Sequence, residues 1–323
     1  MFENKNNIKG KSTFFLVDIF KFIFSLCIVC IHYGIIYKLK IPYPIDYYIQ
    51  KLIFRLAVPF FFVTSGFFLA AKYENTLKIQ EKKNITILYS KHLSILLIIF
   101  NLISILLRIN EYIIPGGLIK FLQAIFFYPI GATWFLLACI IGSWCIYFFY
   151  KIEKKILILP ISTVFYVFAL LCNSYFFVSE KIGISSFISK YMQVFVSARN
   201  GFFCGFFFLS IGFAVRNKYS KWKNENMLVR NRKRLIFPMV GVYLIFCCEV
   251  FFLKNKNHLD DGALFLIMPL FIYLFILFCI TYETSRNVKQ FKRIRTASTI
   301  IYLVHSPILK ILQIVWNLIK IKC

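Results

Sequence analysis

The residues of this sequence best suited to chemistry are ionisable side chains inside apolar segments. Lys21 and His32 lie within the apolar stretch 14–37, and Arg55 lies within the next one, 47–71. At membrane depth an ionisable side chain is unfavourable by several kcal/mol unless it faces a partner or a water-filled cavity. The concentration of such residues near the start of the chain therefore predicts a functional site.

His32 is the strongest candidate for a general base, because a histidine can accept a proton from a hydroxyl group near neutral pH. The competing interpretation is a histidine satisfied by water at the membrane interface. Arg55 has no acidic residue near it in the sequence, so it must hydrogen-bond to a backbone carbonyl, a ligand or a distant acid. Pro59 follows and predicts a broken helix, and broken spanning helices commonly line cavities. We predict that His32 and Arg55 are catalytic residues.

Lys21 is a candidate phosphate-binding residue that a cytoplasmic ligand can reach. It lies 11 residues before His32, which at about 100° per residue places both side chains on one face of a helix, about 16 Å apart along its axis. Asp18 precedes Lys21 by three residues, so an ion pair between these two is the competing interpretation. Both interpretations can hold, and we assign Lys21 and Asp18 to cofactor binding.

Four later residues are weaker candidates, for contacts with the substrate. Arg199 and Asn200 open the apolar stretch RNGFFCGFFFLSIGF, Trp134 lies in TWFLLA, and His305 lies in IYLVHSPIL just before a proline. For Trp134 the competing interpretation is an anchor at the membrane interface. For His305 it is a structural hydrogen bond at a helix kink.

Composition places the chain among membrane proteins. Of its 323 residues, 60% are hydrophobic and 20% aromatic, and the mean hydropathy is +0.73. The net charge of +26 comes from cations in short loops between apolar segments, which is typical of the positive-inside bias and argues against nucleic-acid binding. The histidines are scattered without ligand spacing, so we expect no metal.

The apolar segments predict an all-α, polytopic transmembrane helix bundle of about 9–10 spanning helices, with residues 1–323 forming one domain. Gly66, after Ser65, predicts close packing between two of these helices. An amphipathic element at 184–197 is the alternative tenth span. The nine predicted spans are 14–37, 47–71, 87–107, 131–150, 156–176, 199–215, 235–253, 263–282 and 297–319.

Charge also predicts the orientation. With the N-terminus in the cytoplasm, the segments on the cytoplasmic side hold most of the Lys and Arg residues, as the positive-inside bias requires. We therefore expect a multi-pass protein of the cell membrane. Lys21 then lies in the inner half of the first span, whereas His32 and Arg55 lie in the outer halves of their spans.

Several segments resemble the acyltransferase 3 family of membrane proteins. Asp18, Lys21 and His32 in DIFKFIFSLCIVCIH match the acid, the basic residue and the histidine of that family's first helix. Arg55 with PFFFVTSGFFL is similar to its second helix, and TWFLLACI and IYLVHSPIL are similar to two less specific motifs. The stretch SARNGFFCGFFFLSIG also resembles the membrane domain of membrane-bound serine racemases, which is associated with serine uptake.

The resemblance implies transfer of an acyl group, often acetyl or succinyl, from cytoplasmic acyl-CoA to a hydroxyl of a cell-surface glycan or its lipid-linked precursor. It marks His32 as catalytic, with Lys21 and Arg55 as supporting charges. We therefore predict a membrane O-acyltransferase whose donor substrate is acyl-CoA, and whose partners are a glycan or lipid-linked sugar acceptor and membrane lipids.

Two other functions stay open. One is a permease for a small polar solute such as L-serine, in which the same buried charges line a pathway and His32 relays protons. The other is an accessory subunit of a polysaccharide machine whose site has lost its activity. A homodimer is left open as the oligomeric state.

Overall fold

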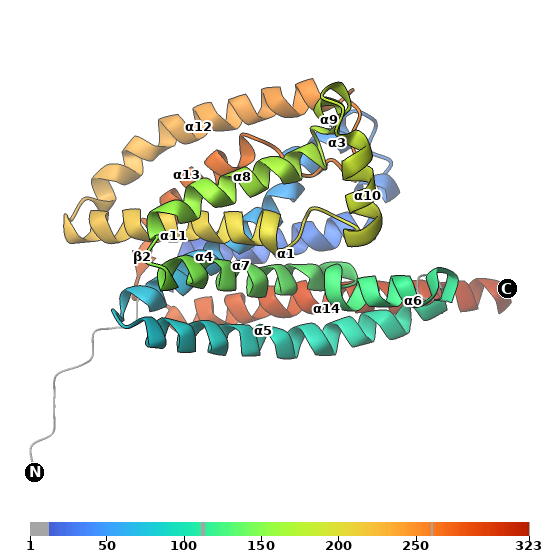
Figure 1. The fold of residues 1–323 in the computed structure, drawn as a ribbon, viewed down its shortest axis with the longest axis horizontal. Coiled ribbons are helices and arrows are strands. Elements are labelled where there is room, and N and C mark those ends of the chain that lie inside the picture. The colour runs from blue at the N-terminus through green and yellow to red at the C-terminus, as the bar shows by residue number, and fades with distance from the viewer. Residues whose placement is uncertain (1–12, 111–113, 260, 323) are drawn as a thin grey trace, which may run out of the picture.

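The computed structural model describes residues 13–110, 114–259 and 261–322, and this part of the chain is almost wholly helical (Figure 1). Two short strands, β1 (Thr13–Phe14) and β2 (Glu283–Thr284), pair antiparallel. The α-helices are α1 (Phe15–Tyr33), α2 (Ile35–Lys38), α3 (Ile45–Leu52), α4 (Ala57–Glu74), α5 (Ile79–Leu107), α6 (Ile114–Leu122), α7 (Trp134–Lys151), α8 (Ile158–Leu171), α9 (Phe176–Lys181), α10 (Ser185–Phe195), α11 (Phe206–Asn224), α12 (Leu228–Leu253), α13 (Met268–Ile280) and α14 (Val288–Lys322).

Short tighter or wider helical turns join several of these helices. They are η1 (Phe54–Leu56), η3 (Gln123–Phe127), η4 (Gly131–Thr133), η5 (Lys155–Leu157) and η6 (Gly201–Gly205). The long helices run side by side, with β2 at one end of the bundle and α3, α9 and α10 at the other (Figure 1). We call these the β end and the α3–α10 end.

The architecture confirms the predicted all-α membrane bundle. Each of the nine predicted spans overlaps one or more helices. Within the described residues, six helical segments are long and apolar enough to cross a membrane. These six are Phe15–Tyr33, Ile45–Glu74, Ile79–Leu107, Gly131–Lys151, Leu228–Leu253 and Val288–Asn317, and shorter apolar helices include Lys155–Leu171 and Met268–Ile280.

The region of the alternative tenth span forms α10, a helix of 11 residues. It lies across the α3–α10 end rather than along the bundle (Figure 1). At 1.5 Å per residue its length is about 16 Å, roughly half the thickness of a membrane core.

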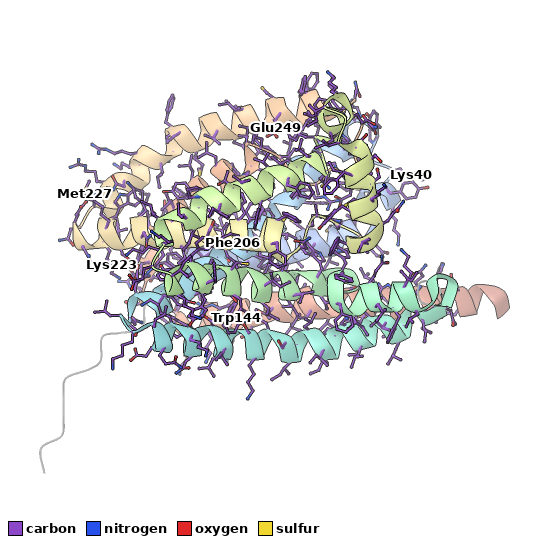
Figure 2. The ribbon with its side chains drawn as sticks, in the orientation of Figure 1. Lys40, Trp144, Phe206, Lys223, Met227 and Glu249 are labelled. Carbon is purple, nitrogen blue, oxygen red and sulfur yellow. The ribbon has the colours of Figure 1, made fainter. Side chains whose placement is uncertain are left out.

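Side chains fill the space between the helices (Figure 2), and many of them are aromatic. The Phe206 ring is buried in the core, where it stacks on Phe149 at a centroid distance of 5.8 Å. Helices α4 and α11 make the most extensive contact, followed by α1 and α14. The backbones of α4 and α11 approach so closely that a Cβ on Gly66 would collide with the Leu209 carbonyl. The predicted packing role of Gly66 is therefore confirmed.

The helix of the second span is irregular about one turn before Pro59, and not at Pro59 as we predicted. The α-helix gives way to the tighter turn η1, and regular α-helix resumes at Ala57. Pro59 is the third residue of α4, where the N–H that proline lacks has no partner within the helix. The irregular turn carries Arg55, and Pro59 follows it without breaking α4.

Candidate functional site

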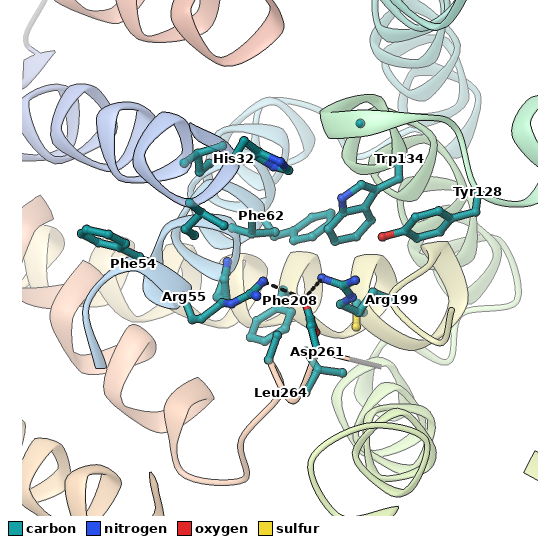
Figure 3. A pocket seen from close by; sticks show the side chains of 17 residues that line it. His32, Phe54, Arg55, Phe62, Tyr128, Trp134, Arg199, Phe208, Asp261 and Leu264 are labelled. Atoms are coloured by element: carbon teal, nitrogen blue, oxygen red, sulfur yellow. Dashed lines mark hydrogen bonds and ion pairs between the residues drawn. The ribbon is translucent and has the colours of Figure 1, made fainter. Parts of the chain in front are cut away.

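A cavity of about 330 Å³ lies at the α3–α10 end of the bundle, and four of the predicted site residues line it. They are His32, Arg55, Trp134 and Arg199. Asp261, which the sequence did not single out, lines it too. Figure 3 shows His32 and Trp134 on one wall, across from the two arginines and Asp261.

Each of these side chains comes from the end of a helix or from a connection. His32 occupies the last turn of α1, which Gly34 ends with a left-handed φ of 67°. Trp134 is the first residue of α7, and Arg199 lies between α10 and η6. Because antiparallel neighbours alternate their ends, segments far apart in sequence meet on one side of the bundle.

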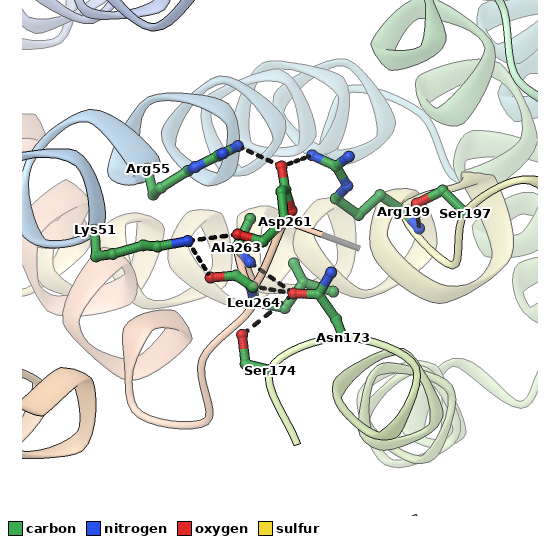
Figure 4. Close-up of polar contacts among 10 residues, drawn as sticks. Lys51, Arg55, Asn173, Ser174, Ser197, Arg199, Asp261, Ala263 and Leu264 are labelled. Carbon is green, nitrogen blue, oxygen red and sulfur yellow. Dashed lines mark hydrogen bonds and ion pairs between the residues drawn. The ribbon is translucent and has the colours of Figure 1, made fainter. Parts of the chain in front are cut away.

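Asp261 joins the two arginines. Its Oδ2 atom accepts from Arg55 Nη1 and from Arg199 Nη1, each at 2.8 Å (Figures 3 and 4). The side chains are largely buried, with exposed fractions of 18% for Arg55, 17% for Arg199 and 29% for Asp261. The distant acid expected as one partner for Arg55 is therefore present.

We call this contact of Asp261 with Arg55 and Arg199 the bridge, and it carries an excess of positive charge. Lys51 donates to the backbone carbonyls of Asp261 and Gly262, with Nζ 2.8 Å from the Gly262 oxygen. Burial would raise the pKa of Asp261, but the charges of Arg199, Arg55 and Lys51 outweigh it and hold that pKa below its ordinary value. Asp261 is therefore ionised at neutral pH, and three cations of the described part of the chain lie around it.

Two side chains hold the backbone that follows Asp261. Asn173 Oδ1 accepts from the backbone N–H groups of Ala263 and Leu264 at 2.6 and 2.9 Å (Figure 4). Further along, Glu249 accepts from the N–H of Ile267 at 2.9 Å. These side chains fix the backbone after Asp261 and so aim its carboxylate at the arginines.

An aromatic surface forms part of the wall. Trp134 stacks on Tyr128 with ring centroids 5.9 Å apart and planes 12° apart. The Arg199 guanidinium lies 5.8 Å from the Trp134 ring. Trp134 thus lines the cavity, and its alternative role as an interface anchor stays a prediction. Its contact with a substrate stays a prediction.

His32 packs against His305, with ring centroids 5.0 Å apart. His305 Nδ1 lies 2.7 Å from the Tyr302 carbonyl oxygen, and since a carbonyl only accepts, Nδ1 carries a proton. His305 Nε2 is buried and has no hydrogen-bond partner among the described residues. His305 therefore makes the expected structural hydrogen bond within α14 and also supports His32, and its contact with a substrate stays a prediction.

His32 also lines a second cavity of about 780 Å³, together with Lys38, Gln313 and Trp316. It therefore lies between two spaces, which leaves its ring accessible from more than one side. Near His305, Arg108 Nη2 donates to Ser306 Oγ at 3.1 Å. Sequence reasoning missed Arg108 because it follows α5 and acquires its neighbours only through packing.

Lys21 and Asp18 lie outside both cavities that His32 lines. Asp18 is 1% exposed, and it pairs through both oxygens with Arg295, with Nε and Nη2 each 2.8 Å away. Thr13 donates to it as well. The competing interpretation, an ion pair between Asp18 and Lys21, is wrong, because the Asp18 carboxylate pairs with Arg295 of α14 instead.

The Lys21 ammonium lies 5.0 Å from the centre of the Phe68 ring, where a cation–π contact favours the charge. Lys21 and His32 belong to one uninterrupted helix, α1. Their 11-residue spacing therefore corresponds to about 16 Å. A cofactor-binding role for Lys21 and Asp18 stays a prediction.

Asn200 is occupied by a local structural task. Its Oδ1 accepts from the N–H groups of Phe202 and Phe203 at the start of η6, and its Nδ2 donates to the Tyr191 hydroxyl at 2.8 Å. This is the capping role typical of asparagine at a helix start. Asn200 is absent from the cavity wall, and its substrate contact stays a prediction.

Within the residues that the structure describes, no group of three or more His, Cys, Asp or Glu side chains is arranged to hold a metal ion.

Comparison with known proteins supports one family. The family model described as an acyltransferase domain matches residues 15–321. An amino-acid racemase from Enterococcus faecalis is 25% identical over 268 residues, which cover 78% of this chain and 34% of that protein. The chain thus spans about a third of the length of the racemase it matches. No solved structure matches the chain.

Proposed function

Because the chain belongs to the acyltransferase-domain family, whose model matches residues 15–321, we propose that it is a membrane O-acyltransferase that uses acyl-CoA. The acyl group is acetyl or succinyl, and the acceptor is a hydroxyl of a cell-surface glycan or of its lipid-linked precursor. We base this on one observation, the cavity shared by His32, Arg55, Trp134 and Arg199. Such a reaction needs a base, a charge-stabilising group and an acceptor surface in one place.

In the proposed reaction His32 accepts the proton of the acceptor hydroxyl, and the hydroxyl oxygen attacks the thioester carbonyl. The tetrahedral intermediate carries a negative charge on the former carbonyl oxygen, and the Arg55 guanidinium either orients the acceptor or stabilises that charge. Collapse of the intermediate breaks the carbon–sulfur bond, and the proton on His32 passes to the coenzyme A sulfur. The acyl group ends on the acceptor oxygen with no net redox change.

We place the N-terminus in the cytoplasm of a cell-membrane protein, as the charge distribution favours. Coenzyme A then approaches from the β end of the bundle, near Lys21. The separation of about 16 Å between Lys21 and His32 suits a donor with a long flexible arm. The acceptor approaches from the α3–α10 end.

The test uses purified full-length protein in lipid nanodiscs. Without an acceptor, water takes the place of the acceptor hydroxyl, so wild-type protein should hydrolyse acetyl-CoA or succinyl-CoA to the free acid and coenzyme A thiol. His32→Ala should lose at least about a hundredfold of this activity, as removal of a general base implies. His92→Ala is the matched control, since His92 is an exposed histidine of α5 outside the site. Equal activity of His32→Ala and wild type would overturn the proposal.

The acceptor is tested in cells by mass spectrometry of surface glycans with wild-type protein and with His32→Ala. Loss of an acetyl or succinyl mass from glycans in the variant would support a glycan acceptor. An unchanged glycan profile, combined with thiol release in nanodiscs, would assign the acyl group to another acceptor.

A permease is the second candidate, because the bridge contains both charge signs. An amino-acid zwitterion can place its carboxylate on Arg55 or Arg199 and its ammonium group on Asp261, whose carboxylate already pairs with both arginines. Uptake of radiolabelled L-serine into proteoliposomes separates the two candidates. Uptake that requires Asp261 would favour the permease, and uptake equal to that of empty liposomes would exclude it.

A further inference from the structure

Among the residues that the structure describes, positively charged side chains outnumber carboxylates around the candidate site. Asp261 joins Arg55 and Arg199 there, and Lys51 donates to the backbone carbonyls beside it. Asp261 is ionised at neutral pH, so its charge compensates for part of this charge excess. A buried guanidinium is stabilised further when a ligand of opposite charge binds to it.

The geometry also leaves donors for such a ligand. Asp261 uses one oxygen, Oδ2, to hold one Nη1 atom from each arginine. Arg55 Nε is buried without a hydrogen-bond partner among the described residues. A guanidinium presents several N–H donors in a planar fork that matches a carboxylate or a phosphate. Arg55 can therefore hold Asp261 and an anionic ligand group together.

The two arginines line the same cavity as the candidate base and the aromatic surface. His32 and Trp134 lie on the wall opposite the bridge (Figure 3). A sugar ring stacked on Trp134 can present a hydroxyl to His32 while an acidic substituent points to the arginines. In that arrangement the reacting hydroxyl and the acidic group belong to the same sugar of the acceptor or to two neighbouring sugars.

We propose that the acceptor is an anionic saccharide, whose carboxylate or phosphate binds between Arg55 and Arg199 while its hydroxyl faces His32. This inference rests on the proposed acyltransferase function and specifies its substrate class. A carboxylate and a phosphate both fit between the two guanidinium groups. A carboxylate would belong to an acidic sugar, and a phosphate to a phosphorylated or lipid-phosphate-linked sugar.

The experiment measures binding without any acyl donor. Full-length protein in neutral phosphatidylcholine nanodiscs is titrated at pH 7 with methyl glucuronoside, methyl glucoside and glucose 6-phosphate. The first two differ only at C6, where the glucuronoside has a carboxylate in place of the hydroxymethyl group. At least one anionic probe should bind about tenfold or more tightly than methyl glucoside, as charge-assisted hydrogen bonds imply, and rising salt should erode the difference. Equal binding of all three probes would overturn the inference.

Two variants test whether the anion binds at the arginines, because they should change anion binding in opposite directions. Arg199→Gln should abolish the preference for the anionic probe, whereas Asp261→Asn should strengthen anion binding by removing the competing carboxylate. Lys181→Gln is the control, because it removes one exposed positive charge from α9 at the same end of the bundle. Weaker anion binding in Asp261→Asn, or equal effects of Arg199→Gln and Lys181→Gln, would contradict the inference.

Two further outcomes separate this inference from the proposed function. Thiol release from acyl-CoA with no preference for anionic probes would overturn the anionic acceptor alone. Displacement of the anionic probe by coenzyme A would assign the charge excess to the donor, which also overturns it. The salt series on wild-type protein decides the question even where a variant does not fold.

Discussion

Arg55 Nη1 and Asp261 Oδ2 lie 2.8 Å apart, although one residue is in the second helical segment and the other in the loop before α13. Arg199, from a third part of the chain, reaches the same oxygen. This contact links three connections at the α3–α10 end. It supplies both the charge of the site and part of the framework that holds it.

The bridge predicts a specific dependence of stability on pH. Because the pKa of Asp261 is lowered in the folded protein, its stabilisation is fully present above the ordinary carboxyl pKa of about 3.9 and is lost as the pH falls through the lower native value. Asp261→Asn should therefore be less stable than wild type at pH 7, by about 1–3 kcal/mol. The gap should begin to narrow as the pH falls below about 3.9.

Thermal unfolding in nanodiscs between pH 7 and pH 3 measures this gap. A difference between wild type and Asp261→Asn that stays constant over the whole range would show that the carboxylate charge does not contribute. The same variant is expected to bind anions more tightly, so its lower stability and its higher affinity are separate readouts.

The contact between α4 and α11 predicts intolerance to a single methyl group. Gly66→Ala places a Cβ against the Leu209 carbonyl, and such overpacking costs about 1–3 kcal/mol. Gly241→Ala is the control, because a Cβ at Gly241 meets nothing within 4 Å and alanine favours a helix. Thermal unfolding should show a loss for Gly66→Ala and no loss for Gly241→Ala. Equal midpoints would contradict the close approach.

The ion pair between Asp18 and Arg295 predicts a structural role at the β end. Asp18→Asn leaves Arg295 without its carboxylate, and since Arg295 is 43% exposed we expect a loss of about 1–3 kcal/mol, below that for a fully buried pair. Glu225→Gln is the control, because its pair with Lys221 is long and exposed at 4.0 Å. If chemical unfolding gives both variants the same stability, the Asp18 pair is not structural.

His305 is predicted to position His32. His305→Ala should lower kcat for acyl transfer by about tenfold with KM little changed, because the ring that supports the general base is lost. His305→Asn keeps an N–H that can donate to the Tyr302 carbonyl, so it should recover thermal stability but leave kcat low. Full activity in His305→Asn would show that the ring contact at 5.0 Å is not needed.

Local sequence patterns were sufficient to predict the helices and the ionisable side chains that each helix carries. The apolar lengths predicted nine spans that overlap helices, and the 11-residue spacing placed Lys21 and His32 on α1. Helix periodicity and membrane thickness act within one segment, so both can be calculated without knowledge of neighbours. The charges inside the first two spans marked His32 and Arg55 for the same reason.

The ion-pair partners of these ionisable side chains were decided by the tertiary structure alone. The sequence paired Asp18 with Lys21 by proximity, but packing of α1 on α14 brings Arg295 to the carboxylate instead. Asp261 lies in a loop with no pattern of its own, and it gains a role because Arg55 and Arg199 meet there. Helix content follows from local hydrogen bonding and hydrophobicity, whereas ion pairs depend on which helix ends converge, and only packing of the whole chain determines that.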